Sequence, residues 1–286
     1  MRTRDRITSV LLLIPAILVV SIILGMMIFL IVFSFKAIGE LPLKEFFTTS
    51  VWNPNSFSES RWGILGLVKS TLFISILSFL LVAPFGLSVA IYISQFSSPK
   101  IKEYIKPVIE ILASVPSVVF GLIGIVFLGP IIANIFGLSN GFNILTVSIL
   151  IAVFTLPSTV SLCEETLNNV KQYHKLSSLA LGADELQTLW KVILPKASKG
   201  IIAAFLINFN KIIGETVIVL MVAGNTLLPP QTPFDSARPI TANIAIEIKE
   251  TVTGSLHWSS LFFLGLILFI FLFSVNLFTE WLIHKK

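Results

Sequence analysis

Two charged side chains interrupt an otherwise apolar stretch of this sequence. Lys211 and Glu215 lie within the run from Gly200 to Ala223, and a charge at the centre of a membrane-spanning helix costs at least about 2.5 to 3.5 kcal/mol. Four residues apart on one predicted helix, the two side chains share a face and can neutralise each other. Asn208 extends this polar face. The face is predicted to line the bundle interior or an ion path; the alternative is a structural ion pair.

The composition explains why these charges are unusual. The 286 residues include 20 basic and 15 acidic side chains, 12% of the chain, whereas 55% of the residues are apolar. The mean hydropathy is +0.93. A soluble domain carries about a quarter charged residues, so the composition predicts an integral membrane protein. The single cysteine, Cys163, excludes a secreted disulfide scaffold.

Intervals without charged residues predict the membrane spans, because about 20 helical residues cross a bilayer. Ile7–Phe35, Ser70–Pro99 and Thr251–Thr279 each predict one span. The longer interval Ile111–Cys163 predicts two, since asparagine and glycine residues near its middle favour a turn. With the run from Gly200 to Ala223, the total is six. The predicted fold class is therefore an all-α polytopic membrane protein.

The positions of the basic residues predict the orientation. If the N-terminus is cytoplasmic, 13 basic residues fall in inside segments and 6 in outside segments. The positive-inside rule then places both termini in the cytoplasm. The basic residues assigned to the inside are Arg2, Arg4, Arg6, Lys100, Lys102, Lys106, Lys171, Lys175, Lys191, Lys196, Lys199, Lys285 and Lys286. The larger outside segments, 36–69 and 224–258, are predicted to be ordered, and they either dock a partner or only link helices.

The predicted inside loop, residues 164–199, has a helical pattern of its own. A capping box begins at Asp184 and precedes an amphipathic helix that Pro195 is expected to stop. Upstream, Tyr173–Leu181 predicts a short helix that ends at Gly182. This helix–turn–helix is predicted to enter a groove on a cytoplasmic protein. The alternative is an amphipathic segment that rests on the membrane surface.

A sequence motif in this loop resembles a known signature. Gly182, followed after nine residues by Val192-Ile193-Leu194-Pro195, is similar to the E-A-A-x3-G-x9-I-x-L-P loop of bacterial ABC importer permeases. The resemblance implies that the loop couples the permease to an ATPase. No Glu stands at the first motif position, so no salt bridge is expected from it. The implied coupling residues are Leu176, Ser177, Ser178, Gly182, Leu186, Leu194 and Pro195.

Small residues recur in the third predicted span. Ser114, Ser117, Gly121 and Gly124 follow one another at helical spacing, with Pro116 as an expected bend. Such a stripe favours close helix contacts, and the alternative is the lining of a path.

The segments Val115–Gly121 and Ile213–Asn225 resemble the PstC family of phosphate ABC transporter permeases, within the CysTW-like group of binding-protein-dependent importer subunits. The similarity appears over most of the chain. It implies one permease domain over 1–286, with a type I importer core at about 68–283, that imports inorganic phosphate. That family usually has Arg at the position of Lys211. Lys keeps the positive charge but lacks the planar guanidinium group, which suits bidentate contact with phosphate oxygens. The predicted path residues are Lys211, Glu215, Asn208, Ser117 and Thr216.

The resemblance also implies partners: a PstA-like second permease, a PstB-like ATPase dimer and a PstS-like extracytoplasmic phosphate-binding protein. The sequence has no P-loop, so ATP is expected in the partner ATPase and no cofactor in this chain. A metal site and nucleic-acid binding are not expected. The rival functions are a permease for molybdate or sulfate, a secondary anion transporter or channel, which needs no ATPase, and a membrane enzyme or scaffold.

Overall fold

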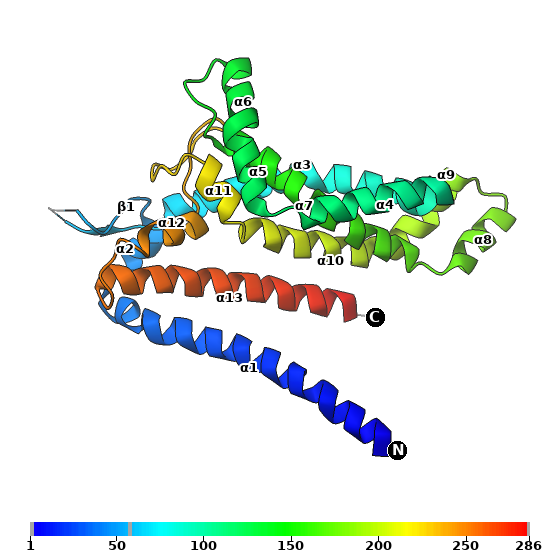
Figure 1. Cartoon of the computed structure of the whole chain (residues 1–286), viewed down its shortest axis with the longest axis horizontal. Coiled ribbons are helices and arrows are strands. Elements are labelled where there is room, and N and C mark those ends of the chain that lie inside the picture. Colours follow the sequence, from blue (N-terminus) through cyan, green and yellow to red (C-terminus); the bar gives the residue numbers. More distant parts are fainter. Residues whose placement is uncertain (1–2, 57–58, 285–286) are drawn as a thin grey trace.

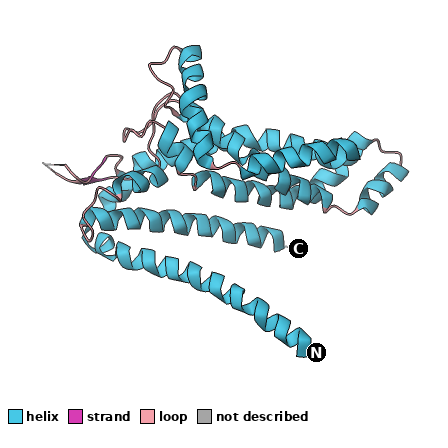
Figure 2. Cartoon of the chain, in the orientation of Figure 1, coloured by secondary structure: helices cyan, strands magenta, loops and turns pink. Residues whose placement is uncertain are grey.

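The computed structural model describes residues 3–56 and 59–284, which form helices and one small hairpin (Figures 1 and 2). Arg2, Lys285 and Lys286, used above for orientation, lie outside the described residues. Within that part of the chain, six helical segments are long and apolar enough to cross a membrane, which confirms the predicted number of spans. Five of them are Leu11–Glu40 (within α1, Thr3–Glu40), Leu65–Phe96 (α3 with a π-helical turn at its end), Ser117–Phe136 (α5 to α6), Ile144–Asn168 (α7) and Leu256–His284 (α13).

The sixth long segment runs from Glu185 to Ile213. It joins α9 (Glu185–Thr188), a π-helical turn at Leu189–Ile193 and α10 (Leu194–Ile213). The shorter elements are α2 (Leu43–Thr48), β1 (Trp52–Asn53), β2 (Arg61–Trp62), α4 (Pro99–Ser114), α8 (Gln172–Ala180), α11 (Val217–Val222) and α12 (Ile240–Glu247).

The long helices are arranged in two groups (Figure 1). Helices α3, α4, α7 and α10 run alongside one another, and α1 and α13 form an antiparallel pair next to them. Both described chain ends and α8 lie at one end of the bundle, hereafter the α8 end. The β hairpin, α2 and α12 lie at the opposite end, hereafter the hairpin end. The N-terminal half of α1 diverges from α13 (Figure 1).

Three apolar clusters hold these elements together. The central cluster joins α3, α7 and α11 through buried side chains such as Ile74, Ile151 and Ile218. A second cluster at the hairpin end packs Phe46 and Trp52 against α13. The third lies toward the α8 end, where Ile193 and Ala197 pack against α7. Ser, Thr and Gly residues at the contacts let the helix backbones approach closely, as membrane helices do.

Pro195 does not end a helix. The expectation that it would is wrong, because α9, the π-helical turn and α10 form one continuous segment across it. The Leu194 N–H bonds to the Leu189 carbonyl, five residues back. This wider turn shifts the hydrogen-bond register just where proline has no N–H to donate. Residues 185–199 thus begin the span instead of forming a separate loop helix.

The third span is broken where a bend was expected. Helix α4 ends at Ser114, and α5 starts at Ser117 after Pro116 in an extended conformation. Ser114 therefore belongs to a different helix from Ser117, Gly121 and Gly124. A Cβ atom added at Gly121 would meet Met221 of α11, and one at Gly124 would meet Leu150 of α7 and Val222 of α11. The two glycines make close helix contacts, as the spacing favoured.

Candidate functional site

Lys211 lies on α10 opposite the middle of α7. Its Nζ donates to the Ser158 hydroxyl at 3.4 Å and stands 4.8 Å from the centre of the Phe154 ring. The Ser158 hydroxyl in turn lies 2.8 Å from Oδ1 of the buried Asn208. A cation is attracted to an aromatic face and to an acceptor oxygen. Lys211 and Asn208 are thus brought together, as predicted, through a serine on another helix.

Ser158 and Phe154 were missed by the sequence reasoning. Both stand in an apolar span without charges, and only the Pro157-Ser158 pair marks that part of α7 as different. Pairing between spans is not encoded in local spacing, so the contact from α7 to α10 becomes visible only in the folded chain.

Glu215 does not share a helix face with Lys211. Helix α10 ends at Ile213, with Gly214 as its C-cap, and α11 starts at Val217. The Glu215 Oε1 accepts from the backbone N–H groups of Val217 at 3.0 Å and Ile218 at 3.1 Å. The first N–H groups of a helix have no partner within the helix, and the Glu215 carboxylate accepts from two of them at the start of α11.

The predicted ion pair between Lys211 and Glu215 is therefore wrong for this structure: it is absent from the ion pairs of residues 3–56 and 59–284. The physical reason is the break at residues 214–216. The Thr216 hydroxyl donates to the Gly214 carbonyl at 3.2 Å, and the Thr241 hydroxyl donates to the Glu215 carbonyl at 3.1 Å. Carbonyls freed by the end of α10 are satisfied locally instead of by a continuing helix.

Ser117, the remaining predicted path residue, begins α5 and is half-buried. Helix α5 packs against α11, the helix that Glu215 caps. Ser117 and Glu215 thus stand at the starts of two helices that touch each other. Lys211, Ser158 and Asn208 form the other group of polar side chains, on α7 and α10.

The α8 end carries an exposed apolar tip. Helix α8 ends at Ala180, close to the predicted helix end, and Gly182 follows in a left-handed conformation with φ of +87°. At the start of α9, the Gln187 N–H bonds to the Asp184 carboxylate at 2.7 Å, and the Asp184 N–H bonds to the Gln187 side chain at 3.4 Å. The capping box is confirmed. Four large apolar side chains are exposed around this turn: Leu176, Leu181, Leu186 and Trp190.

The tip is fixed to the bundle from its inner side. The hydroxyl groups of Ser178 and Thr188 lie 2.9 Å apart and join α8 to α9. Leu189 and Ile193 are buried in the apolar cluster with α7. Exposed Leu186 and Trp190 therefore project from a helix whose other face is anchored to the bundle and which continues into α10.

Comparison with known proteins assigns the class. Residues 82–286 match the family described as binding-protein-dependent transport system inner membrane component, and the chain belongs to this family. Solved structures share the fold. The TM-score is 0.61 to a bacterial ABC transporter involved in the import of the acidic polysaccharide alginate, at 16% identity over 97% of this chain and 94% of that chain. It is 0.59 to the MetNI methionine ABC transporter, at 16% identity over 76% of this chain and 92% of that chain. The fold is that of a type I ABC importer permease.

Sequence relatives narrow the class further. The chain is 33% identical to the probable ABC transporter permease protein YqgH of Bacillus subtilis, over 88% of this chain and 81% of the relative. It is 29% identical to the phosphate transport system permease protein PstC of Mesorhizobium japonicum, over 91% of this chain and 84% of the relative. The chain is a PstC-like ABC permease, a multi-pass membrane protein.

Proposed function

We propose that this chain is the permease subunit of an ATP-driven importer for inorganic phosphate. The observation that carries the proposal is Lys211, a cation opposite the middle of α7. Its ammonium group is held by a hydroxyl and an aromatic ring, and among the described residues no carboxylate forms an ion pair with it, although the Glu215 charge acts on it at longer range. Such a cation attracts an anion, and without a cluster of charges it also lets the anion leave. The choice of phosphate as the substrate is supported by similarity to the PstC proteins.

Coupling to ATP hydrolysis belongs to the exposed tip. Leu176, Leu186 and the turn at Gly182 present an apolar surface of the kind that enters a groove on a partner. In this proposal an ATPase dimer binds the tip in the cytoplasm, and its closure moves α10 through the continuous helix from Glu185 to Ile213. Both termini are then cytoplasmic, since they lie at the α8 end (Figure 1).

The hairpin end would face the outside. The segments that form it are ordered: β1 pairs with β2, and α12 packs on α13. An extracytoplasmic phosphate-binding protein is proposed to dock there, and a PstA-like second permease to complete the path.

Uptake by vesicles that contain the full complex tests the proposal. ATP inside the vesicles should drive entry of labelled phosphate in the presence of the binding protein, and sulfate and molybdate should not compete. A complex that imports sulfate or molybdate and excludes phosphate would contradict phosphate as the substrate. It would leave the assignment as an ABC permease unchanged. ATP-independent uptake by this chain alone would instead favour a secondary transporter.

A further inference from the structure

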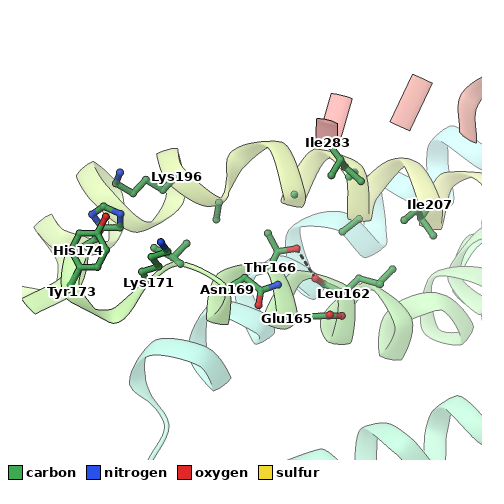
Figure 3. Close-up of a pocket in the computed structure, with 15 residues that line it drawn as sticks. Leu162, Glu165, Thr166, Asn169, Lys171, Tyr173, His174, Lys196, Ile207 and Ile283 are labelled. Carbon is green, nitrogen blue, oxygen red and sulfur yellow. Dashed lines mark hydrogen bonds between the residues drawn. The ribbon is translucent and has the colours of Figure 1, made fainter. Parts of the chain in front are cut away.

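A cavity of about 610 Å³ opens at the α8 end of the chain (Figure 3). It lies between the last turns of α7, the start of α8 and the first half of α10, with Ile283 of α13 on one side. Its inner wall is apolar, with Leu162, Ala203 and Ile207 among its residues. Gly200 lies so close to Thr166 that a Cβ atom there would collide with it, so the two helices approach tightly at the floor.

Three basic side chains converge at the mouth of this cavity: Lys171, His174 and Lys196. Figure 3 shows Lys196 beside the His174 ring, with Lys171 on the neighbouring turn. None of the three forms an ion pair within the part of the chain that the structure describes. The one acidic residue that lines the cavity, Glu165, lies on the α7 side, away from Lys196 and His174 (Figure 3).

The three groups also act on one another. Partial burial and the positive charges of Lys196 and Lys171 lower the pKa of the His174 imidazole below its usual value of 6.5. The lowered pKa favours the neutral imidazole, so the positive charge at the mouth comes mainly from Lys171 and Lys196, which are exposed to solvent. An anion bound between them would favour the protonated imidazole and raise the pKa of His174.

The inner end of the cavity leads toward the candidate path. Ile207 lies one helical turn from Lys211 on α10, and Leu162 lies one turn from Ser158 on α7. Lys196 and Lys211 are separated by about 22 Å along the axis of α10, at about 1.5 Å per residue. The basic mouth thus lies on the same side of α10 as the central lysine.

We propose that this cavity is a binding site for a phosphate-type oxyanion, held between the side chains of Lys171, His174 and Lys196. Two sources supply this chemistry: inorganic phosphate that has passed Lys211, and the phosphate of an anionic lipid headgroup whose acyl chain follows the apolar wall. If the cavity releases transported phosphate, that role rests on the proposed function. That the cavity binds an oxyanion does not depend on the proposed function.

His174 itself serves as the reporter. Diethylpyrocarbonate modifies neutral imidazole, so the rate of modification at each pH gives the pKa of a histidine, and peptide mass spectrometry assigns it within a complex. His284 is exposed in the same chain and serves as the internal reference. The intact complex is measured in phosphatidylcholine nanodiscs, with inorganic phosphate or with chloride at the same ionic strength.

Inorganic phosphate should raise the pKa of His174 by roughly one unit relative to chloride and leave His284 unchanged. Lys196→Gln should remove most of this shift. Lys100→Gln, which removes an exposed lysine of α4 outside the cavity, should keep it.

The lipid source is tested without added phosphate, in nanodiscs that contain phosphatidylglycerol. A shift only in these nanodiscs assigns the site to a lipid headgroup, and a shift with free phosphate assigns it to the transported ion. No shift in either condition, or an equal loss of the shift in Lys196→Gln and Lys100→Gln, would overturn the site. None of these outcomes depends on transport. If the binding site is disproved, the proposed function is still tested separately by the uptake assay.

Discussion

The ammonium group of Lys211 is held by a hydroxyl and an aromatic ring, and Glu215 caps another helix. The two side chains form no ion pair, and the Glu215 charge acts on Lys211 only at longer range, so the effects of their substitutions should be close to additive. Glu215→Ala should lower the free energy of unfolding by about 1 kcal/mol, the usual cost of a lost helix cap. The double variant with Lys211→Ala should equal the sum of the single changes within about 0.5 kcal/mol. Denaturant unfolding of the purified complex measures this.

A double variant more stable than Glu215→Ala alone would contradict this prediction, since it would mean that each charge compensates the other. Lys211→Arg serves as the matched control for transport. It keeps the charge, and we expect it to keep phosphate uptake, whereas Lys211→Met should lose it.

Asp235 fixes the loop after α11 by accepting three hydrogen bonds. Its carboxylate binds the N–H groups of Gln231 at 2.6 Å and Thr232 at 2.8 Å, and the Thr232 hydroxyl at 3.0 Å. These bonds hold the pKa of Asp235 below its usual 3.8. A lowered pKa contributes stability that is complete above pH 3.8 and is lost as the pH falls through the folded-state pKa.

The protection of residues 231–237 against hydrogen exchange, measured relative to the intrinsic rate at each pH, should therefore fall below about pH 4 in the wild type. Asp235→Asn should show low protection at all pH values, because the amide accepts more weakly than the carboxylate. Equal pH profiles for the two proteins would show that another group controls the loop.

At the scale of elements, Gly182 is the turn between α8 and α9, and its φ of +87° strains a side chain with a Cβ. No atom lies within 4 Å of an added Cβ, so Gly182→Val acts through the backbone, at a cost of about 1 to 2 kcal/mol. We expect membrane insertion to persist and ATP-driven uptake to fail, because the tip that would meet the ATPase is displaced. Uptake and ATPase activity in vesicles check this.

Gly137→Val provides the matched control. Gly137 follows α6 with φ of +65°, and an added Cβ there also meets no atom within 4 Å. The same backbone strain, away from the tip, should spare coupling. If both variants lose uptake equally, the effect of Gly182→Val is general strain and not a coupling defect.

The elements that were predictable from the sequence are those set by local rules. Uncharged intervals predicted six spans, and Asp184, Gln187 and Gly182 marked the ends of the short helices correctly. The errors arose where contacts between distant parts of the chain overrode the pattern expected from local spacing. Spacing alone placed Lys211 and Glu215 on one face, but Glu215 satisfies the start of α11 instead. The role of Ser158 could not be predicted for the same reason, since its partner Asn208 lies 50 residues away in the sequence.

At the scale of the molecule, a buried polar cluster closes the hairpin end. Glu247 accepts from the Trp52 indole at 2.8 Å, lies 2.8 Å from His257 Nε2 and pairs with Arg238 at 3.3 Å. These partners come from the hairpin, from α13 and from the segment before α12. One carboxylate thereby links the hairpin, 195 residues earlier in the sequence, to α13 and to the segment before α12.

Glu247→Ala should destabilise the protein by about 3 to 5 kcal/mol, because it leaves the partly buried Arg238 without its counter-charge and removes the partner of Trp52 and His257. Glu247→Gln should be milder, since the amide oxygen still accepts from Trp52. Thermal unfolding followed by tryptophan fluorescence measures both. Glu250→Gln, an exposed change three residues away, is the control, and a loss of stability as large as that of Glu247→Ala would contradict the role of the cluster.

The pairing of α1 with α13 sets an order for biosynthesis. The Ser259 hydroxyl donates to the Phe33 carbonyl at 2.6 Å and accepts from the Ala37 N–H at 3.1 Å, across more than 220 residues. Ser259 lies more than 220 residues after Phe33, so the C-terminal half of α1 enters the bilayer before its packing partner has been made. During that interval lipid or another subunit covers it. Helix α13 therefore completes the packing of α1 only after the intervening spans have been made.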